Sequence, residues 1–393
     1  MGAVGVIAEY NPFHTGHAWH LAETRRILGE ETAVVCVMSG SWVQRGECAL
    51  TDKWTRAAMA LRGGADLVLE LPVPWAISSA ESFARGAVAS LKATGVVETI
   101  SFGSESDSLD DLRQIAEVTQ TAEFQAVLHT ELDKGVSFAD ARQRAALQIM
   151  GKEARLLQGP NDSLGVEYIR AAGNDLAVMT VKRQGVPHDS DSPADGFASA
   201  TMLRRLARQG EAEALPRWMA EEDVDLLRKA GIARMEHIER AILARLRQMT
   251  EEDFAALPDS GEAEGLPVRL CRAASKAGSL KEFYTLAKTR RYAHSRIRRL
   301  ALWAFLSMTE ADRPESPGYL RVLGMNGRGK ERLREMKDRA NLPILTKPAH
   351  IKNLEPAAQQ LFALECKATD LYGLCFDKPR SKGLDFTTGP VIL

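Results

Sequence analysis

The chain has 393 residues, of which 45% are apolar and 26% charged, a composition typical of a globular protein large enough for two cores. Its five cysteines are scattered and odd in number, so neither a disulfide framework nor a Cys-based zinc site is predicted. No apolar run approaches the roughly 18 residues of a membrane span. No secretory signal precedes the first apolar run, so we expect a cytoplasmic protein.

The net charge of −1 hides an asymmetry between the two halves of the chain. Residues 1–200 hold 17 Lys and Arg against 26 Asp and Glu, a balance of −9, and residues 201–393 hold 34 against 26, a balance of +8. A basic half is a typical footprint for a polyanion such as RNA. A helical domain with well-solvated Lys and Arg faces has the same charge, so composition leaves both interpretations open.

The first half alternates strand-like and helix-like segments. Apolar runs predict strands at Val4–Ala8, Thr32–Met38, Asp66–Leu71 and Val97–Phe102, with helices over 17–29, 53–62 and 80–94 between them. This alternation predicts a Rossmann-like α/β domain over residues 1–205, with a mostly parallel sheet covered by helices. Ligands of such sheets bind at the carboxyl ends of the strands, so we expect the turns that follow these strands to converge there.

The remainder of the chain shows fewer strand signals. Helices are predicted over 106–157, 201–255 and 269–310, a strand over Val178–Val181, and loops over 184–196 and 258–267. The second domain, residues 206–393, is therefore predicted to be mainly α-helical and basic.

The most informative motif, Asn11-Pro-Phe-His-Thr-Gly-His17, follows the first predicted strand. A helix is expected to begin near His17, which places two imidazoles where free N–H groups and the helix dipole attract an anion. Gly16 lets the backbone approach a phosphate, and the imidazoles can donate to oxygens that gain charge as pyrophosphate leaves. The motif predicts adenylyl transfer from ATP, with His14 and His17 catalytic. Zinc binding that includes His20 is not favoured, because no Cys or carboxylate completes the site.

A second phosphate-binding element is predicted after the loop at 184–196. Ser199 and Thr201 stand at a predicted helix start and Arg204 follows one turn later, so they can bind phosphate oxygens. Taken alone, the same residues read as an ordinary helix cap followed by a surface arginine. Their occurrence together with the His-x-Gly-His motif favours the phosphate role.

Polar residues that follow other predicted strands are further candidates. Contacts to a carboxylate substrate or to phosphate are predicted for Ser39, Gln44, Arg45 and Lys53, although a solvated loop is an equal alternative. Asn161 can bind adenine or ribose, or cap the helix that follows it. Arg183 ends a predicted strand and is expected to contact the nucleotide.

Two basic segments in the second half are candidate RNA contacts. Residues 324–330 fit Gly-x4-Gly-Lys, but Glu331 follows where a phosphate loop needs Ser or Thr for magnesium, so we predict a flexible basic turn in helical surroundings. Its RNA contacts would be Arg328 and Lys330. The run at 288–300 combines basic residues with an aromatic ring, which suits phosphates and unpaired bases, although a solvated helix face is the alternative. Its predicted contacts are Lys288, Arg290, Arg291, Tyr292, Arg296, Arg298 and Arg299.

Taken together, these motifs resemble the bacterial tRNA(Met) cytidine acetate ligase family. The matching segments are Glu9–His17, Met38–Gly40, Gln44–Gly46, Lys53-Trp54, Phe102–Glu105, Pro160-Asn161, Leu164-Gly165, Ser199–Thr201 and Lys288–Tyr292. The resemblance runs from residue 5 to about residue 330, and the remainder matches nothing that we can place.

The resemblance implies a nucleotidyltransferase-type first domain and an ATP-dependent ligase. Such an enzyme converts acetate into acetyl-adenylate and transfers the acetyl group to N4 of the wobble cytidine of elongator tRNA(Met), releasing AMP and pyrophosphate. The resemblance implies a nucleotide site formed by Ile7, Ala8, Glu9, Tyr10, Asn11, Pro12, Phe13, His14, Thr15, Gly16, His17, Ala18, Trp19 and His20, together with Gly103, Asn161 and Arg183. Mg²⁺ is expected to accompany ATP, and the basic half is expected to hold the tRNA.

Two other functions are weighed against this one. A small-molecule adenylyltransferase is usually built from the first domain alone, so the basic second half argues against it. A non-catalytic RNA-binding protein on a nucleotidyltransferase fold would not need His14, Gly16 and His17, which are all present. The residue that binds acetate and the oligomeric state are not indicated by the sequence.

Overall fold

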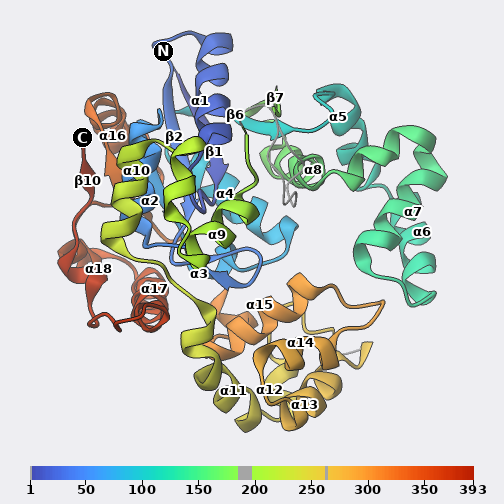
Figure 1. Cartoon of the computed structure of the whole chain (residues 1–393). Coiled ribbons are helices and arrows are strands. Elements are labelled where there is room, and N and C mark those ends of the chain that lie inside the picture. Colours follow the sequence, from blue (N-terminus) through green and yellow to red (C-terminus); the bar gives the residue numbers. More distant parts are fainter. Residues whose placement is uncertain (1, 185–196, 262–263) are drawn as a thin grey trace.

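A central sheet organises the chain in this computed structural model, which describes residues 2–184, 197–261 and 264–393 (Figure 1). Its strands run in the order β10-β8-β5-β2-β1-β6-β7, with β9 beside β8. Their bounds are β1 (Ala3–Ala8), β2 (Ala33–Ser39), β5 (Leu67–Leu71), β6 (Val97–Ser104), β7 (Ala177–Lys182), β8 (Leu320–Met325), β9 (Ile344–Leu345) and β10 (Val391–Ile392).

The strands predicted in the first half are confirmed and are mutually parallel. β1 pairs with β2 on one side and β6 on the other, β2 pairs with β5, and β6 with β7. Every residue of β2 is buried because helices cover both faces of the sheet. The carboxyl ends of β1, β2, β6 and β7 therefore meet at one edge.

Two groups of helices form the covering layers. One face carries α1 (Thr15–Leu28), α2 (Lys53–Arg62), α9 (Ala200–Gln209), η2 (Ala212–Arg217) and α10 (Glu221–Ala230). The other carries α3 (Val73–Ala76), α4 (Ala80–Ala93), α8 (Pro160–Ala172), α16 (Gly327–Arg339) and α17 (Pro356–Tyr372). In the described part of the chain, no helix has the length and apolar character needed to cross a membrane.

A small helical arm extends from the sheet after β6. It consists of α5 (Leu109–Val118), α6 (Ala122–Asp133), α7 (Phe138–Met150) and η1 (Gly151–Gln158), as the helical periodicity predicts. Phe124 and Leu128 of α6 pack against alanines of α7 in a separate small core. Figure 1 shows this arm projecting to the right of the sheet.

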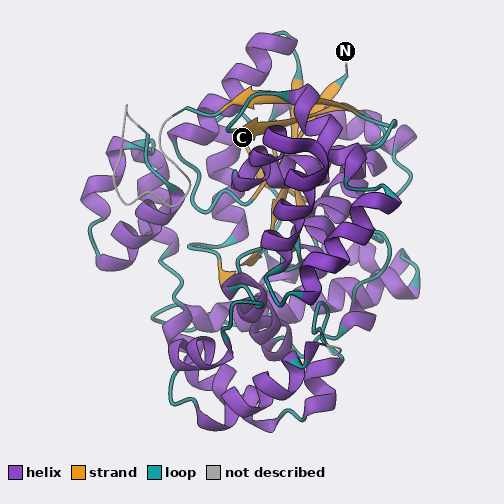
Figure 2. Cartoon of the chain, turned by 90° about the vertical axis from the view of Figure 1, so that its right-hand side faces the viewer, coloured by secondary structure: helices purple, strands orange, loops and turns teal. Residues whose placement is uncertain are grey.

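Residues 235–312 form a helical module with its own core. It contains η3 (Met235–Ile238), α11 (Glu239–Gln248), α12 (Glu251–Ala255), α13 (Leu266–Lys276), α14 (Leu280–Ala287), α15 (His294–Phe305) and η5 (Glu310–Asp312). Its core contains Phe254, Phe283 and Trp303, and Trp42 from the first half of the chain also packs into it. Figure 2 shows only helices and loops in this lower part of the molecule, as predicted.

After the helical module the chain returns to the sheet, which the sequence did not predict. β8 pairs antiparallel with β5, and β9 and β10 pair parallel with β8. The apolar run of β8 escaped notice because Arg321 interrupts it. The remaining segments are η6 (Pro348–Asn353), η7 (Gly373–Cys375) and α18 (Leu384–Thr387). A domain boundary after residue 205 stays a prediction, but residues 320–392 complete the sheet of the first half and do not extend the helical module.

The prediction of a flexible turn in helical surroundings at residues 324–330 is wrong. Gly324 and Met325 end β8, and Asn326 caps α16 by accepting a hydrogen bond from the Gly329 N–H at 2.9 Å. Gly329 packs directly against the carbonyl of Asp66, so a larger residue would not fit. Because β8 runs antiparallel to β5, this turn lies at the edge of the sheet opposite to the carboxyl ends of β1 and β2.

Candidate active site

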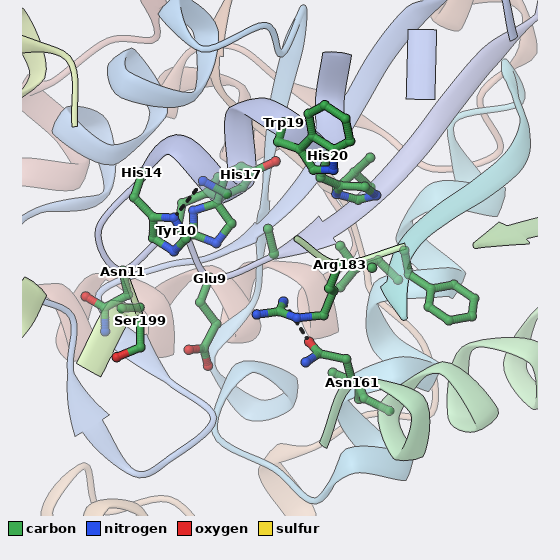
Figure 3. Close-up of a pocket in the computed structure, with 18 of the residues that line it drawn as sticks. Glu9, Tyr10, Asn11, His14, His17, Trp19, His20, Asn161, Arg183 and Ser199 are labelled. Atoms are coloured by element: carbon green, nitrogen blue, oxygen red, sulfur yellow. Dashed lines mark hydrogen bonds between the residues drawn. The ribbon is translucent and has the colours of Figure 1, made fainter. Parts of the chain in front are cut away.

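A cavity lies at the carboxyl ends of β1, β6 and β7, where the parallel strands were predicted to bind a ligand (Figure 3). The predicted nucleotide-site residues that line it are Ile7, Ala8, Glu9, Tyr10, Asn11, His14, Gly16, His17, Trp19, His20, Gly103, Asn161, Arg183, Ser199 and Arg204. Pro12, Phe13, Thr15, Ala18 and Thr201 do not line it. The predicted loop at 184–196 lies outside the described residues except for Gln184, which lines the cavity.

The structure places the two motif histidines together at the start of α1. His14 is the N-cap, and its Nδ1 accepts a hydrogen bond from the Gly16 N–H at 3.0 Å. This bond requires an unprotonated Nδ1, so the neutral ring carries its proton on Nε2 as a donor. The rings of His14 and His17 stack with centroids 3.9 Å apart. The helix starts at Thr15, two residues before the predicted start, which leaves both imidazoles at its N-terminus as expected.

Two aromatic residues support the histidine pair from behind. The Tyr10 ring lies 4.9 Å and the Phe13 ring 5.5 Å from the His17 ring, measured between centroids. Phe13 is buried over Gly63, where any side chain would collide with its ring. Phe13 therefore fixes the position of His17 without itself lining the cavity.

His20 occupies the wall of the cavity next to β6. Its Nε2 lies 3.0 Å from Ser101 Oγ, which in turn lies 2.8 Å from Thr24 Oγ1. Burial, together with the positive charge of Arg183, lowers the pKa of His20 to about 4. This ring is therefore neutral at pH 7 and held by a hydrogen-bond chain.

The ends of β6 and β7 and the start of α8 continue this side of the cavity, across from His14 and His17. Arg183 Nη1 donates to Asn161 Oδ1 at 3.4 Å. Glu105 accepts hydrogen bonds from the backbone N–H groups of Asn161 and Asp162. These N–H groups stand at the start of α8, where they have no partner within the helix. Glu105 therefore caps this helix, a role for which Asn161 was a candidate. The Asn161 side chain also lines the cavity, where its Nδ2 donates to Glu105 Oε1 and its Oδ1 accepts from Arg183.

Ser199 and Arg204 both prove to have structural contacts at the cavity. Ser199 Oγ accepts the Met202 N–H at 3.0 Å and so caps α9. Arg204, which is 9% exposed, donates to the Asn11 carbonyl at 2.8 Å and to Thr201 Oγ1 at 3.1 Å. Burial lowers the pKa of Arg204. Ser199 is thus a helix cap as the alternative interpretation has it, Arg204 is buried and not the surface arginine of that interpretation, and the phosphate role stays a prediction.

The segment predicted as a polar loop after β2 is a hairpin of β3 (Trp42–Val43) and β4 (Glu47–Cys48). Gln44 and Arg45 at its tip line the cavity, as predicted, and so does Glu47. Gly46, with a φ of 75°, lies against the backbone of α15, and Glu47 makes an ion pair with Arg298 of that helix. The hairpin thus joins the cavity to the helical module.

Lys53 and Ser39 were predicted to contact substrate, but neither lines the cavity. Lys53 is fully buried, and its Nζ lies 2.6 Å from Glu70 Oε1 and 2.8 Å from Asp385 Oδ1. Ser39 is also fully buried. The first turn of α2 faces the interior between β5 and the returning C-terminal segment, so this lysine belongs to a buried ion cluster.

Sequence reasoning missed Arg56, a fully buried guanidinium behind the cavity. It donates to the carbonyls of Glu9 at 2.7 Å, Ser39 at 3.0 Å and also Gly40. These carbonyls lie at the carboxyl ends of β1 and β2. The available signal was that Met59 and Ala60 follow Arg56 at helical spacing, so the helix is apolar on this side too, and a charge there needs buried partners.

Most of the predicted RNA contacts in the helical module already have protein partners. Tyr292 is 5% exposed and its hydroxyl donates to the Glu264 carbonyl, so the ring does not present a face to a base. Arg299 donates to the Gln44 carbonyl, and Arg296 makes an ion pair with Glu264. Arg290 is exposed.

A groove on the helical module gathers further cations. Arg272 and Lys276 of α13 line it together with Arg291, and both α13 residues are exposed. The sequence had not singled out Arg272 and Lys276, because helical spacing alone does not show which surface faces a groove. Arg328 lies away from this module, on α16, and makes an ion pair with Glu31 at 3.3 Å.

Comparison with known proteins shows which family this chain belongs to. A protein-family model described as HIGH nucleotidyl transferase matches residues 1–385. tRNA(Met) cytidine acetate ligases from Thermoanaerobacter sp. (strain X514) and Caldanaerobacter subterraneus subsp. tengcongensis are 36% and 37% identical, over 98% of each chain. The crystal structure of apo Thermotoga maritima TmcAL superposes with a TM-score of 0.94, and the form bound with alpha-thio ATP with 0.91, at 34% identity and full coverage of both chains. The similarity thus continues beyond residue 330.

Proposed function

Because the chain belongs to the tRNA(Met) cytidine acetate ligase family, we propose that it joins acetate to N4 of the wobble cytidine of elongator tRNA(Met) at the expense of ATP. The reaction proceeds through acetyl-adenylate and releases AMP and pyrophosphate. The observation that carries this proposal is the stacked pair of His14 and His17 at the N-terminus of α1, inside a cavity at the carboxyl edge of the sheet.

In the first step, the phosphates of ATP bind at the N-terminus of α1. An acetate oxygen attacks the α-phosphorus, the bond to the bridging oxygen breaks, and pyrophosphate leaves. His14 Nε2–H and the His17 ring donate to the phosphate oxygens that gain negative charge. Arg204 and the start of α9 with Ser199 provide positive charge and donors for the outer phosphates.

The adenosine binds on the opposite side of the cavity. Asn161 and Arg183 contact the base or ribose, and Gly103 allows its close approach. Phe102 and Tyr168, whose ring centroids lie 5.8 Å apart, supply an apolar wall. An apolar wall with a few fixed polar groups is typical of nucleoside sites.

Acetate binds beside the hairpin tip, where Arg45 and Gln44 line the cavity. A guanidinium is the side chain best suited to a carboxylate, because its paired donors match the two oxygens. We propose that the acetate oxygen approaches the α-phosphorus from this side of the cavity.

Magnesium enters with ATP. Within the described ranges, no three His, Cys, Asp or Glu side chains gather as a metal site. This fits Mg²⁺, which keeps several waters and is held mainly by substrate phosphates in many ATP sites. The ion supplies charge neutralisation for the leaving pyrophosphate, and the chain positions it through its hold on the phosphates.

The tRNA binds to the helical module and presents its anticodon loop to the cavity. Arg290 and the groove of Arg272, Lys276 and Arg291 offer cations for phosphates. The hairpin of β3 and β4 spans from α15 to the cavity, so RNA bound on the module lies next to the reactive site. An unpaired wobble base can leave its stack at modest cost.

The direct test is mass spectrometry of nucleosides from elongator tRNA(Met), unmodified at the wobble base. The tRNA is incubated with the protein, magnesium-ATP and isotopically labelled acetate. Labelled N4-acetylcytidine that appears only with ATP is the expected result. Its absence in a preparation that still binds ATP overturns the proposal and redirects the search to small-molecule acceptors of an adenylyl group.

A further inference from the structure

The transfer step needs a group that removes a proton from the attacking amine. The cytosine 4-amino group is conjugated with the ring, so it is a weak nucleophile and becomes positively charged when it attacks a carbonyl carbon. A positioned base that takes this proton accelerates such steps by about 10²–10⁴-fold. The base must lie in the cavity where acetyl-adenylate forms.

Two carboxylates line the cavity among the described residues, Glu9 and Glu47. Glu47 is held in an ion pair by Arg298 of α15. Glu9 makes no ion pair with any residue that the structure describes, and one of its oxygens accepts the Gln44 N–H at 2.8 Å. This single bond orients the carboxylate and leaves acceptor capacity on the other oxygen.

His14 and His20 line the cavity too, but their hydrogen bonds make them poor candidates for this base. His14 uses Nδ1 to accept the Gly16 N–H and carries its proton on Nε2, so it is a donor. His20 is bonded to Ser101, and its pKa of about 4 makes it a weak base. Neither ring is available to take up a proton near neutral pH.

The position of Glu9 fits a role between the nucleotide and the incoming base. It follows the end of β1, and its backbone carbonyl is anchored by Arg56 at 2.7 Å. Figure 3 shows its side chain directed into the cavity, with His14 and His17 on one side and Arg183 and Asn161 on another. Gln44, which fixes the carboxylate, belongs to the hairpin that contacts the helical module.

We propose that Glu9 is the acceptor for the cytosine 4-amino group and the general base of acetyl transfer. The inference rests on the proposed function. The N4 lone pair attacks the acetyl carbon, a C–N bond forms, and the C–O bond to the phosphate of AMP breaks. AMP leaves with the bonding electron pair as its phosphate anion, and the N4 proton moves to the free Glu9 oxygen. No other reactant is needed.

The experiment separates the two half-reactions in Glu9→Gln, in which the amide oxygen can still accept the Gln44 N–H. Acetate-dependent ATP–pyrophosphate exchange reports adenylation. Single-turnover transfer from synthetic acetyl-adenylate to unmodified elongator tRNA(Met) reports the second step without ATP or magnesium. The control is Glu123→Gln, the same change at an exposed position of α6.

We expect Glu9→Gln to lose transfer by about 100-fold or more and to lose clearly less of the exchange reaction than of the transfer reaction. Glu9→Asp, which keeps a carboxylate, should recover part of the transfer rate. It also provides the comparison if Glu9→Gln does not fold.

Three results would overturn the assignment. Equal loss of exchange and transfer, or a raised magnesium requirement for exchange, would place Glu9 at the nucleotide and its metal instead. Transfer at the wild-type rate would remove Glu9 from the chemistry altogether. If the wild-type protein shows no acetate-dependent exchange, the proposed function itself fails. Because this result comes from the wild-type protein alone, it is distinct from a failure of the Glu9 assignment.

Discussion

The rings of His14 and His17 stack 3.9 Å apart, with 30° between their planes, at the N-terminus of α1. His14 has two separable tasks there. Its Nδ1 caps the helix by accepting the Gly16 N–H, and its Nε2 is the donor that we propose for a phosphate. A side chain that keeps the first task and loses the second can therefore test the chemistry without disturbing the fold.

His14→Asn is predicted to fold normally and to lose adenylation. Asn is a preferred N-cap and its Oδ1 can accept the Gly16 N–H, so the melting temperature should stay close to that of wild type. The missing Nε2 donor should slow acetate-dependent pyrophosphate exchange by about 10²–10³-fold. His14→Ala, the comparison, should also lose about 1 kcal/mol of stability. Wild-type exchange by His14→Asn would refute the donor role.

His17→Ala is predicted to abolish acetylation while leaving tRNA binding largely intact. The ring lines the cavity and does not line the groove of the helical module, so its removal is expected to affect the nucleotide site. Nucleoside mass spectrometry gives the activity, and filter binding with labelled tRNA gives the affinity. Turnover of tRNA at the wild-type rate would show that the ring has no phosphate role.

Charge reversal of Arg290 and Arg291 is predicted to weaken tRNA binding and to spare pyrophosphate exchange. Each lost phosphate contact should reduce the slope of log affinity against log salt by about 1. Lys152→Glu, an exposed reversal in η1, is the control for general charge effects. Equal loss of binding and exchange would indicate misfolding rather than a binding surface.

Lys53→Met is predicted to destabilise the fold by about 3–5 kcal/mol because it leaves buried carboxylates without their cation. Burial lowers the pKa of Lys53, but Asp385 and Glu70 outweigh it, so the pKa is raised overall and the lysine stays charged. Denaturant unfolding measures the loss. Lys92→Met, at the exposed ion pair with Asp175, should cost less than about 1 kcal/mol. Unchanged stability with lost exchange would return Lys53 to the active site.

Asp223→Asn is predicted to stabilise the protein at pH 8 and not at acidic pH. Burial raises the pKa of Asp223 to about 6 from its usual value of 3.8. The folded state therefore binds this proton more tightly than the unfolded chain, and stability falls as pH rises through this range. Removal of the buried charge should raise the free energy of unfolding by about 1–3 kcal/mol at pH 8.

Thermal unfolding at pH 4 and pH 8 measures the effect of Asp223→Asn. Asp225→Asn, at an exposed position of the same helix, is the matched control and should show no such pH-dependent gain. A gain for Asp223→Asn that is equal at both pH values would show that the carboxylate is not the cause.

Local patterns were sufficient to predict the centre of the site. The motif from Asn11 to His17 follows the end of β1 at Ala8 and contains the turn and the helix start within one short segment, so neighbouring residues decide its geometry. The turns after β2 and β6 were predicted to converge with it because parallel strands end at one edge, and of these the turn after β6 does so, whereas Ser39 after β2 is buried away from the cavity. Gly103, Asn161 and Arg183 line the cavity accordingly.

Contacts between distant segments were beyond prediction. Lys53 appeared to be a substrate contact because its partner Asp385 lies at the other end of the chain and is joined to it only by folding. Tyr292 appeared to be an RNA contact because its burial depends on how α13 and α15 pack. The return of β8 to the sheet was hidden by Arg321, whose charge is matched by Glu70 and Asp385.

The sequence by itself determined the parallel sheet, the histidine pair at a helix start and the class of ligand, because hydrophobic periodicity and short motifs act over a few residues. Only the tertiary structure decided which polar residues face the cavity. Gln44 and Lys53 stand nine residues apart, yet one lies at the cavity and the other in a buried ion cluster. The physical reason is that a charge settles where its partners are, and those partners come together only when the chain is folded.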